Sequence, residues 1–240
     1  MRTSRLVTSI FTILVGPGCG HVVDVPEPPE TPFIQAILVA GRTAEARVEM
    51  LRVGEDEPVQ IDPVEVDLAL VDQSGTRCPL VPSSGSPGAY QATIAIAPGG
   101  RYRLEGTVAG IPVSAETTVP VAFEVEAPAD DTIRATPLVD PAGFDLAEVP
   151  FRWSASGASA FQIDSATFTL GSLITRATEG RFALPRRAAG SPPGPRIRIL
   201  ALNADADGFL DRRGRPLSNI RGGFGVLGGA VEARRVVAWR

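Results

Sequence analysis

The sequence predicts an all-β protein in which an immunoglobulin-like sandwich is followed by a second β-rich domain of the fibronectin-III-like kind. Three observations favour this class. Apolar and polar residues alternate from Phe33 onward, proline and glycine separate the short alternating runs, and no long stretch has apolar residues at helical spacing. A strand with such alternation turns one face to a core and the other to water. We therefore expect stacked sheets.

The first residues have the order of a secretory signal peptide. Arg2 and Arg5 precede an apolar run from Leu6 to Val15, and small residues follow. The run has about 10 residues, whereas a membrane-spanning helix needs roughly 20. We therefore expect residues 1–18 to be read by the export machinery and removed.

Cys19 directly follows a Gly-Pro-Gly segment, an arrangement that resembles the lipobox of bacterial lipoproteins. We expect this cysteine to carry lipid, palmitate included. Each CH₂ of the acyl chains that is buried in the membrane would add roughly 0.8 kcal/mol of membrane affinity. The alternative is a plain signal peptide with an incidental cysteine. Residues 19–32 are rich in proline and acid and have no apolar period, which predicts an extended tether. Gly20, not aspartate, follows the cysteine, and this favours the outer membrane.

The first domain is expected over residues 33–125. A turn is predicted at Asp72–Gly75, and the apolar faces of Tyr90–Ile96 and Tyr102–Val108 predict a hairpin through the glycines between them. Together with the other runs they give about seven short strands, the number typical of an immunoglobulin-like sandwich. The other runs with strand character are Ala46–Met50, Val64–Leu68 and Ile111–Val119.

The polar segment Glu126–Asp131 is the expected boundary, and residues 126–240 form the second expected domain. Near its end, Ser218–Gly229 interleaves glycines with apolar residues. Because disorder would expose those apolar side chains, we expect this glycine-rich segment to dock on the second domain as irregular β structure and to lead into a final strand, Ala230–Trp239. The other expected strands are Phe151–Trp153, Ala160–Ile163, Ala166–Leu170 and Arg196–Leu202.

Three segments resemble an uncharacterised family of Gram-negative envelope lipoproteins, the domain-of-unknown-function family forty-two forty-nine. They are FIQAILVAG at Phe33 to Gly41, the long run from Gly88 to Pro120, and SNIRGGFGVLGG at Ser218 to Gly229. The resemblance implies a β-sandwich lipoprotein of the outer membrane or cell surface, often encoded near outer-membrane nutrient receptors. It brings no catalytic residues to this chain.

The residue types disfavour catalysis. The single histidine, His21, lies in the expected tether, the chain has no lysine, and no nucleophile-elbow or P-loop pattern occurs. We expect no enzymatic activity and no cofactor, with a two-carboxylate hydrolase as the alternative. The net charge of −4 argues against a nucleic-acid surface. With Cys19 lipidated, Cys78 has no disulfide partner and is expected to be a small, buried residue.

One motif resembles the opening of a calcium loop, because Asn203, Asp205 and Asp207 alternate ahead of a glycine. Gly214 stands where an EF-hand needs a bidentate glutamate, and helices are not expected on either side. We therefore expect an Asx-rich turn without metal, and the three oxygen-bearing residues are kept as the alternative metal ligands.

These features predict a non-catalytic lipoprotein of the cell envelope, anchored to the outer membrane through Cys19. It would be an accessory or binding component whose partner is an outer-membrane nutrient receptor or another envelope protein. The alternative is an extracellular carbohydrate- or ligand-binding module. In that case Trp153, Phe209 or Phe224 would stack on the ligand, although the mid-strand position of Trp153 favours core packing instead.

Overall fold

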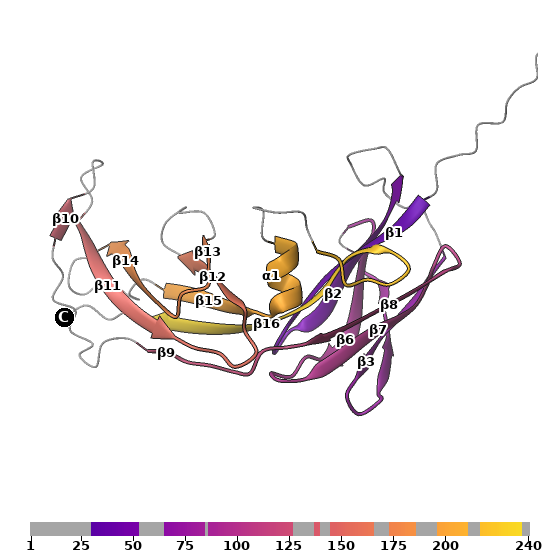
Figure 1. Ribbon diagram of the computed structural model, residues 1–240, viewed down its shortest axis with the longest axis horizontal. Coiled ribbons are helices and arrows are strands. Elements are labelled where there is room, and N and C mark those ends of the chain that lie inside the picture. The colour runs from indigo at the N-terminus through magenta and orange to yellow at the C-terminus, as the bar shows by residue number, and fades with distance from the viewer. Residues whose placement is uncertain are drawn as a thin grey trace, which may run out of the picture.

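The computed structural model describes residues 30–52, 65–84, 86–126, 137–139, 145–165, 173–185, 196–210 and 217–236. In these residues the strands form three sheets, and the one other element is a short helix. The expected all-β sandwich class is therefore confirmed (Figure 1). The expected signal peptide, Cys19, His21 and the strand Ala166–Leu170 lie outside the described residues. Residues 30–32, expected to end the tether, belong to the first strand.

The large sheet has eight strands and spans both expected domains. Its two central strands come from opposite ends of the described chain and pair in parallel, with Phe33 opposite Phe224 and Val39 opposite Ala230. The sheet therefore crosses the boundary expected at Glu126. In spatial order its strands are β13 (Leu173–Thr175), β12 (Ala160–Ser165), β15 (Arg196–Leu202), β16 (Phe224–Val236), β1 (Glu30–Val39), β2 (Thr43–Arg52), β6 (Ala89–Ala95) and β5 (Val81–Pro82).

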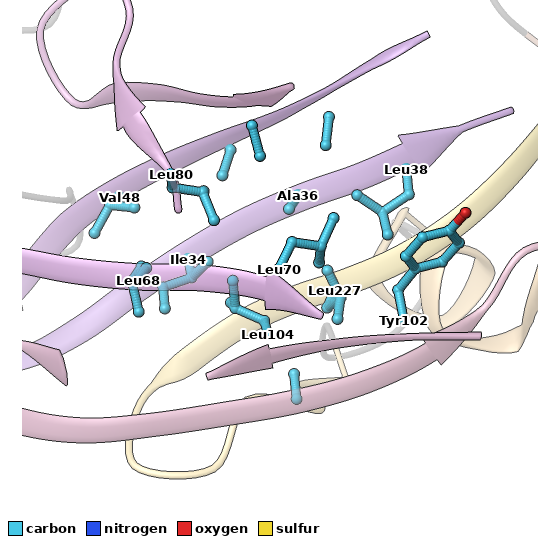
Figure 2. Close-up of a cluster of buried hydrophobic side chains, with 14 of the residues drawn as sticks. Ile34, Ala36, Leu38, Val48, Leu68, Leu70, Leu80, Tyr102, Leu104 and Leu227 are labelled. Atoms are coloured by element: carbon cyan, nitrogen blue, oxygen red, sulfur yellow. The ribbon is translucent and has the colours of Figure 1, made fainter. Parts of the chain in front are cut away.

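A four-stranded sheet packs on one face of the large sheet beside β1 and β2. Its strands are β4 (Arg77–Pro79), β3 (Val66–Asp72), β7 (Arg101–Val108) and β8 (Ile111–Thr118). Figure 2 shows the first core between them, where Leu68, Leu70 and Leu104 meet Ile34 and Leu227. These five side chains are at most 1 % exposed, and burying each contributes about 1.5–3 kcal/mol.

The hairpin expected between Tyr90–Ile96 and Tyr102–Val108 is wrong. β6 pairs with β2 in the large sheet, whereas β7 pairs with β3 and β8 in the small one. The glycines between them turn a corner from one sheet to the other, and Tyr102 ties this corner. Its hydroxyl accepts a hydrogen bond from Ala97 N at 2.7 Å and donates one to Ala95 O at 3.2 Å. Both apolar faces point into one core, a pattern that alternation cannot distinguish from a hairpin.

The third sheet packs on the same face of the large sheet, farther along β16. Its strands are β10 (Pro137–Val139), β11 (Asp145–Trp153) and β14 (Glu179–Pro185), with β9 (Val125–Glu126) pairing β11. Trp153 is 2 % exposed in this second core, and its Nε1 donates to Ala177 O at 3.0 Å. Trp153 is therefore a core residue and offers no stacking surface to a ligand.

β16 contributes to both cores. It includes the last residues of the glycine-rich segment, from Phe224 to Gly229. Leu227 belongs to the first core, while Val231 and Ala233 belong to the second. The close backbone approach expected of the segment is present, but its expected docking on the second domain is wrong: the segment pairs in parallel with β1, Leu227 enters the first core, and the final strand already begins at Phe224. A Cβ on Gly229 would lie 2.8 Å from Thr118 O, and one on Gly225 would overlap the backbone of Ile34.

Helix α1 (Ala204–Leu210) lies on the opposite face of the large sheet, over β16 (Figure 1). Ala206 of α1 rests on Gly228, where a Cβ would come within 2.8 Å of the Ala206 Cβ. The helix covers only part of this outer face, and Glu45 and Arg47 of β2 are exposed beside it. No helix in the described ranges has the length and apolar character that a membrane span requires.

Candidate functional site

The open part of the outer face contains a groove of about 650 Å³. Along β1 the side chains alternate, so that Ile34 and Ala36 enter the core while Gln35 and Ile37 are half-buried on the outer face. On β2 the exposed residues of this face are Glu45 and Arg47. The full lining comprises Gln35, Ile37, Glu45, Ala46, Arg47, Ser83, Ser86, Pro87, Ala89 and Tyr90.

The groove is hollow because a small residue follows two longer ones in a row across the sheet. Gln35 of β1 lies opposite Arg47 of β2, and Arg47 lies opposite Ala89 of β6. Directly opposite residues of antiparallel strands present their side chains on the same face. The methyl group of Ala89 therefore leaves a depression beside Arg47.

Ser83, Ser86 and Pro87 form one wall of this depression, and neighbouring backbone hydrogen bonds hold them in place. Ser83 N donates to Ala89 O at 2.8 Å, and Val48 N donates to Gly88 O at 2.8 Å. Gly88 has a φ of +71°, and a Cβ there would lie 3.0 Å from Val48 O. Glycine is thus required at this turn, and the wall is fixed before any ligand arrives.

The charged groups of the groove differ in how they are held. Arg47 Nε donates to Glu49 Oε1 in an ion pair, and Glu49 is only 3 % exposed. Since an unpaired buried carboxylate is costly, this pair holds the Arg47 guanidinium in position. In contrast, the side chains of Gln35 and Glu45 form no hydrogen bond or ion pair within the described part of the chain. Their polar groups are available to a ligand.

A patch of three phenylalanines adjoins the groove along β1. Phe33 stacks on Phe224 with ring centroids 6.0 Å apart, and Phe209 of α1 packs against Phe33 at 6.3 Å. All three are half-buried. Phe33, which the sequence did not single out, thus brings the two aromatic candidates Phe209 and Phe224 together. Each of them already contacts its ring.

The calcium-like motif forms the start of α1, so the expected Asx-rich turn is corrected to a helix N-cap. Asn203 Oδ1 accepts from Ala206 N at 3.0 Å, and Asp207 N donates to Asn203 O at 2.9 Å. Asp205 accepts a hydrogen bond from the Thr117 hydroxyl. The two acids lie in the first turn of the helix, where negative charge is favourable.

Each of the three candidate metal ligands is engaged in a hydrogen bond or an ion pair, and Asn203 and Asp205 share Thr117 as a partner. Asp207 is 6 % exposed and forms an ion pair with Arg176, with Nη2 and Oδ2 3.0 Å apart. The Asn203 amide is occupied by backbone and hydroxyl groups. Within the described ranges no three or more acidic, histidine or cysteine side chains gather in an arrangement that could hold a metal ion.

A cluster of three arginines surrounds Glu232 on the outer face of β16. Arg42, Arg198 and Arg234 each form an ion pair with its carboxylate, Arg198 Nε lying 3.1 Å from Oε2. Burial raises the pKa of Glu232, but the hydrogen bond from Arg234 and the nearby positive charges outweigh burial. The pKa of Glu232 is therefore lower than usual. We call this group the Glu232 cluster.

The fold and the groove define an all-β sandwich protein with an open, polar face. No protein-family model matches the chain, and no curated protein matches it. Among solved structures, it is similar to a DUF4785 family protein from Legionella pneumophila subsp. pneumophila str. Philadelphia 1, at 9 % identity and a TM-score of 0.23. The alignment covers 69 % of this chain and 51 % of that one, so this chain spans about half that protein's length. Membership of family forty-two forty-nine stays a prediction.

Proposed function

We propose that the protein is a non-catalytic envelope lipoprotein, anchored to the outer membrane through Cys19, whose β-sandwich body binds a partner or ligand. The observation that carries the proposal is the order of the first 19 residues: two arginines, an apolar run too short to span a bilayer, and a cysteine after small residues. Acyl chains on that cysteine would hold the body at the membrane.

The distance between lipid and body is short. β1 begins at Glu30, so residues 20–29 separate the cysteine from the first strand. Ten residues reach at most about 35 Å even when fully extended. The sandwich would therefore stay near the membrane surface, where an outer-membrane receptor is accessible to it.

A second function, that of an extracellular ligand-binding module, is supported by the groove over β1 and β2. Its volume of about 650 Å³ is in the range of small-ligand sites, and Gln35 and Glu45 have unused polar groups. The two functions are compatible, because a lipid anchor would hold the groove at the cell envelope.

The test is to express the full chain in a Gram-negative host and to fractionate the cells. The parent protein and Cys78→Ser should be found in the outer-membrane fraction, whereas Cys19→Ser should be soluble or retained as an unprocessed precursor. Cys78→Ser is the matched control, because the chain has two cysteines. Outer-membrane retention of Cys19→Ser with a fully processed N-terminus would refute the anchor.

A further inference from the structure

We propose that the groove formed by Gln35, Glu45 and Arg47 binds a neutral oligosaccharide. This inference rests on the proposed function of an envelope binding protein, and it names the ligand class and the residues that recognise it. These residues differ from the aromatic candidates, of which Trp153 is buried and the other two pack on Phe33.

The first argument is the mixture of donors and acceptors. The Glu45 carboxylate accepts hydrogen bonds, the Gln35 amide both accepts and donates, and the Nη groups of Arg47 donate while Nε is held by Glu49. Glu45 and Arg47 are two residues apart on one face of β2, or about 7 Å. Hydroxyl groups both donate and accept, so a polyol can satisfy all three side chains at once.

The second argument is charge. The positive charge of Arg47 is already balanced by Glu49, and Glu45 adds a carboxylate without an ion-pair partner in the described residues. An anionic ligand would be repelled by Glu45, and a cationic ligand would meet the fixed guanidinium. A neutral ligand avoids both costs. Ile37 adds an apolar surface for the C–H face of a sugar ring.

The nearby sheet edge favours a saccharide over a peptide. An extended peptide would be expected to add as a strand to the nearby edge of the sheet, which is β5. That edge strand has only two residues, Val81 and Pro82, and proline has no N–H to donate. Recognition at this groove must therefore come from side chains.

The experiment titrates detergent-solubilised full-length protein with a panel of neutral hexasaccharides: α-1,4-glucan, β-1,3-glucan, β-1,4-glucan, β-1,4-mannan and β-1,4-galactan. Saturation-transfer NMR detects binding, and calorimetry measures the affinity. We expect at least one oligosaccharide to bind. Glu45→Ala should weaken it by about tenfold or more, as expected for a hydrogen bond to a charged group. The matched control is Asp67→Ala, which removes an exposed acid from β3 of the small sheet.

A second variant tests the shape of the groove. Ala89→Phe fills the depression beside Arg47 without removing any polar group, and aromatic residues are well accommodated in strands. It should abolish binding while the circular dichroism spectrum and the melting temperature stay close to those of the parent. If Ala89→Phe fails to fold, Gln35→Ala takes its place.

Three results would overturn the proposal: no oligosaccharide of the panel binds, binding is equal in Glu45→Ala and Asp67→Ala, or a folded Ala89→Phe variant binds as tightly as the parent. None of them bears on membrane anchoring, which the Cys19 and Cys78 variants test separately.

Discussion

Asn203→Ala removes the side chain that connects β8, helix α1 and β16. Asn203 is 7 % exposed, and its Oδ1 accepts from Ala206 N and Gly229 N, both at 3.0 Å. Its Nδ2 donates to Thr117 Oγ1 at 2.6 Å and to Thr118 O at 3.0 Å. One amide thus connects the end of β8, the first turn of α1 and the middle of β16.

The expected cost follows from the groups left without partners. Loss of the N-cap costs about 1 kcal/mol, and the buried N–H of Gly229 left without an acceptor costs about 1–3 kcal/mol more. Water entering from the cleft that Asn203 lines would lower the second contribution. We therefore predict that Asn203→Ala lowers the free energy of unfolding by about 2–4 kcal/mol.

Urea denaturation followed by tryptophan fluorescence, to which buried Trp153 contributes, measures this change. The matched control is Gln73→Ala, an exposed amide in the turn after β3, which should shift the free energy by less than about 0.5 kcal/mol. A midpoint and slope for Asn203→Ala equal to those of the parent would refute the view that this amide stabilises the junction of β8, α1 and β16.

Three further predictions concern β16. Gly225 has a φ of +121°, and a Cβ there would overlap a backbone carbonyl of β1, so Gly225→Ala should lower the free energy of unfolding by about 3 kcal/mol or more in thermal unfolding. The control Gly41→Ala, at a φ of +76° in open space, should cost about 1–2 kcal/mol. Equal losses in the two variants would contradict the close approach of β16 to β1. Leu227→Ala should cost about 2–5 kcal/mol, and half-buried Phe224→Ala less than the 3–5 kcal/mol expected of a core phenylalanine, as chemical denaturation would reveal. Because the folded-state pKa of Glu232 is lowered, its stabilisation is present above the ordinary glutamate pKa and is lost as the pH falls through the folded-state value. Glu232→Gln should thus reduce the acid dependence of the melting temperature, and an unchanged acid limb would contradict this.

Local pattern predicts the strands of this protein well, because alternation determines which side chains of β1, β2 and β15 enter a core. Pairing over long distances is a different matter. The parallel pairing of β1 with β16 brings together residues that lie near opposite ends of the chain, such as Phe33 and Phe224. No local signal in the sequence specifies this pairing. The same limit explains the wrong hairpin between β6 and β7, whose apolar faces meet across a core.

Helix α1 was missed although its signals are present. Asn203 is a favourable N-cap and two acids follow in the first turn, but the helix has only seven residues, too few to show an apolar period. The groove was missed for another reason. Gln35, Glu45 and Arg47 alternate like any solvent-facing residues, and the depression beside them depends on the small Ala89 and on the wall of Ser83, Ser86 and Pro87, which no local pattern specifies.

The most direct test of the proposed function is the mass of the mature N-terminus. The full chain is expressed in a Gram-negative host that is fed an alkyne analogue of palmitate, purified from membranes and digested. The account predicts that the N-terminal peptide begins at Cys19, carries the mass of a diacylglyceryl group and acyl chains, and contains the alkyne. A mature protein with an unmodified N-terminal peptide, or with its cleavage site away from Cys19, would contradict it.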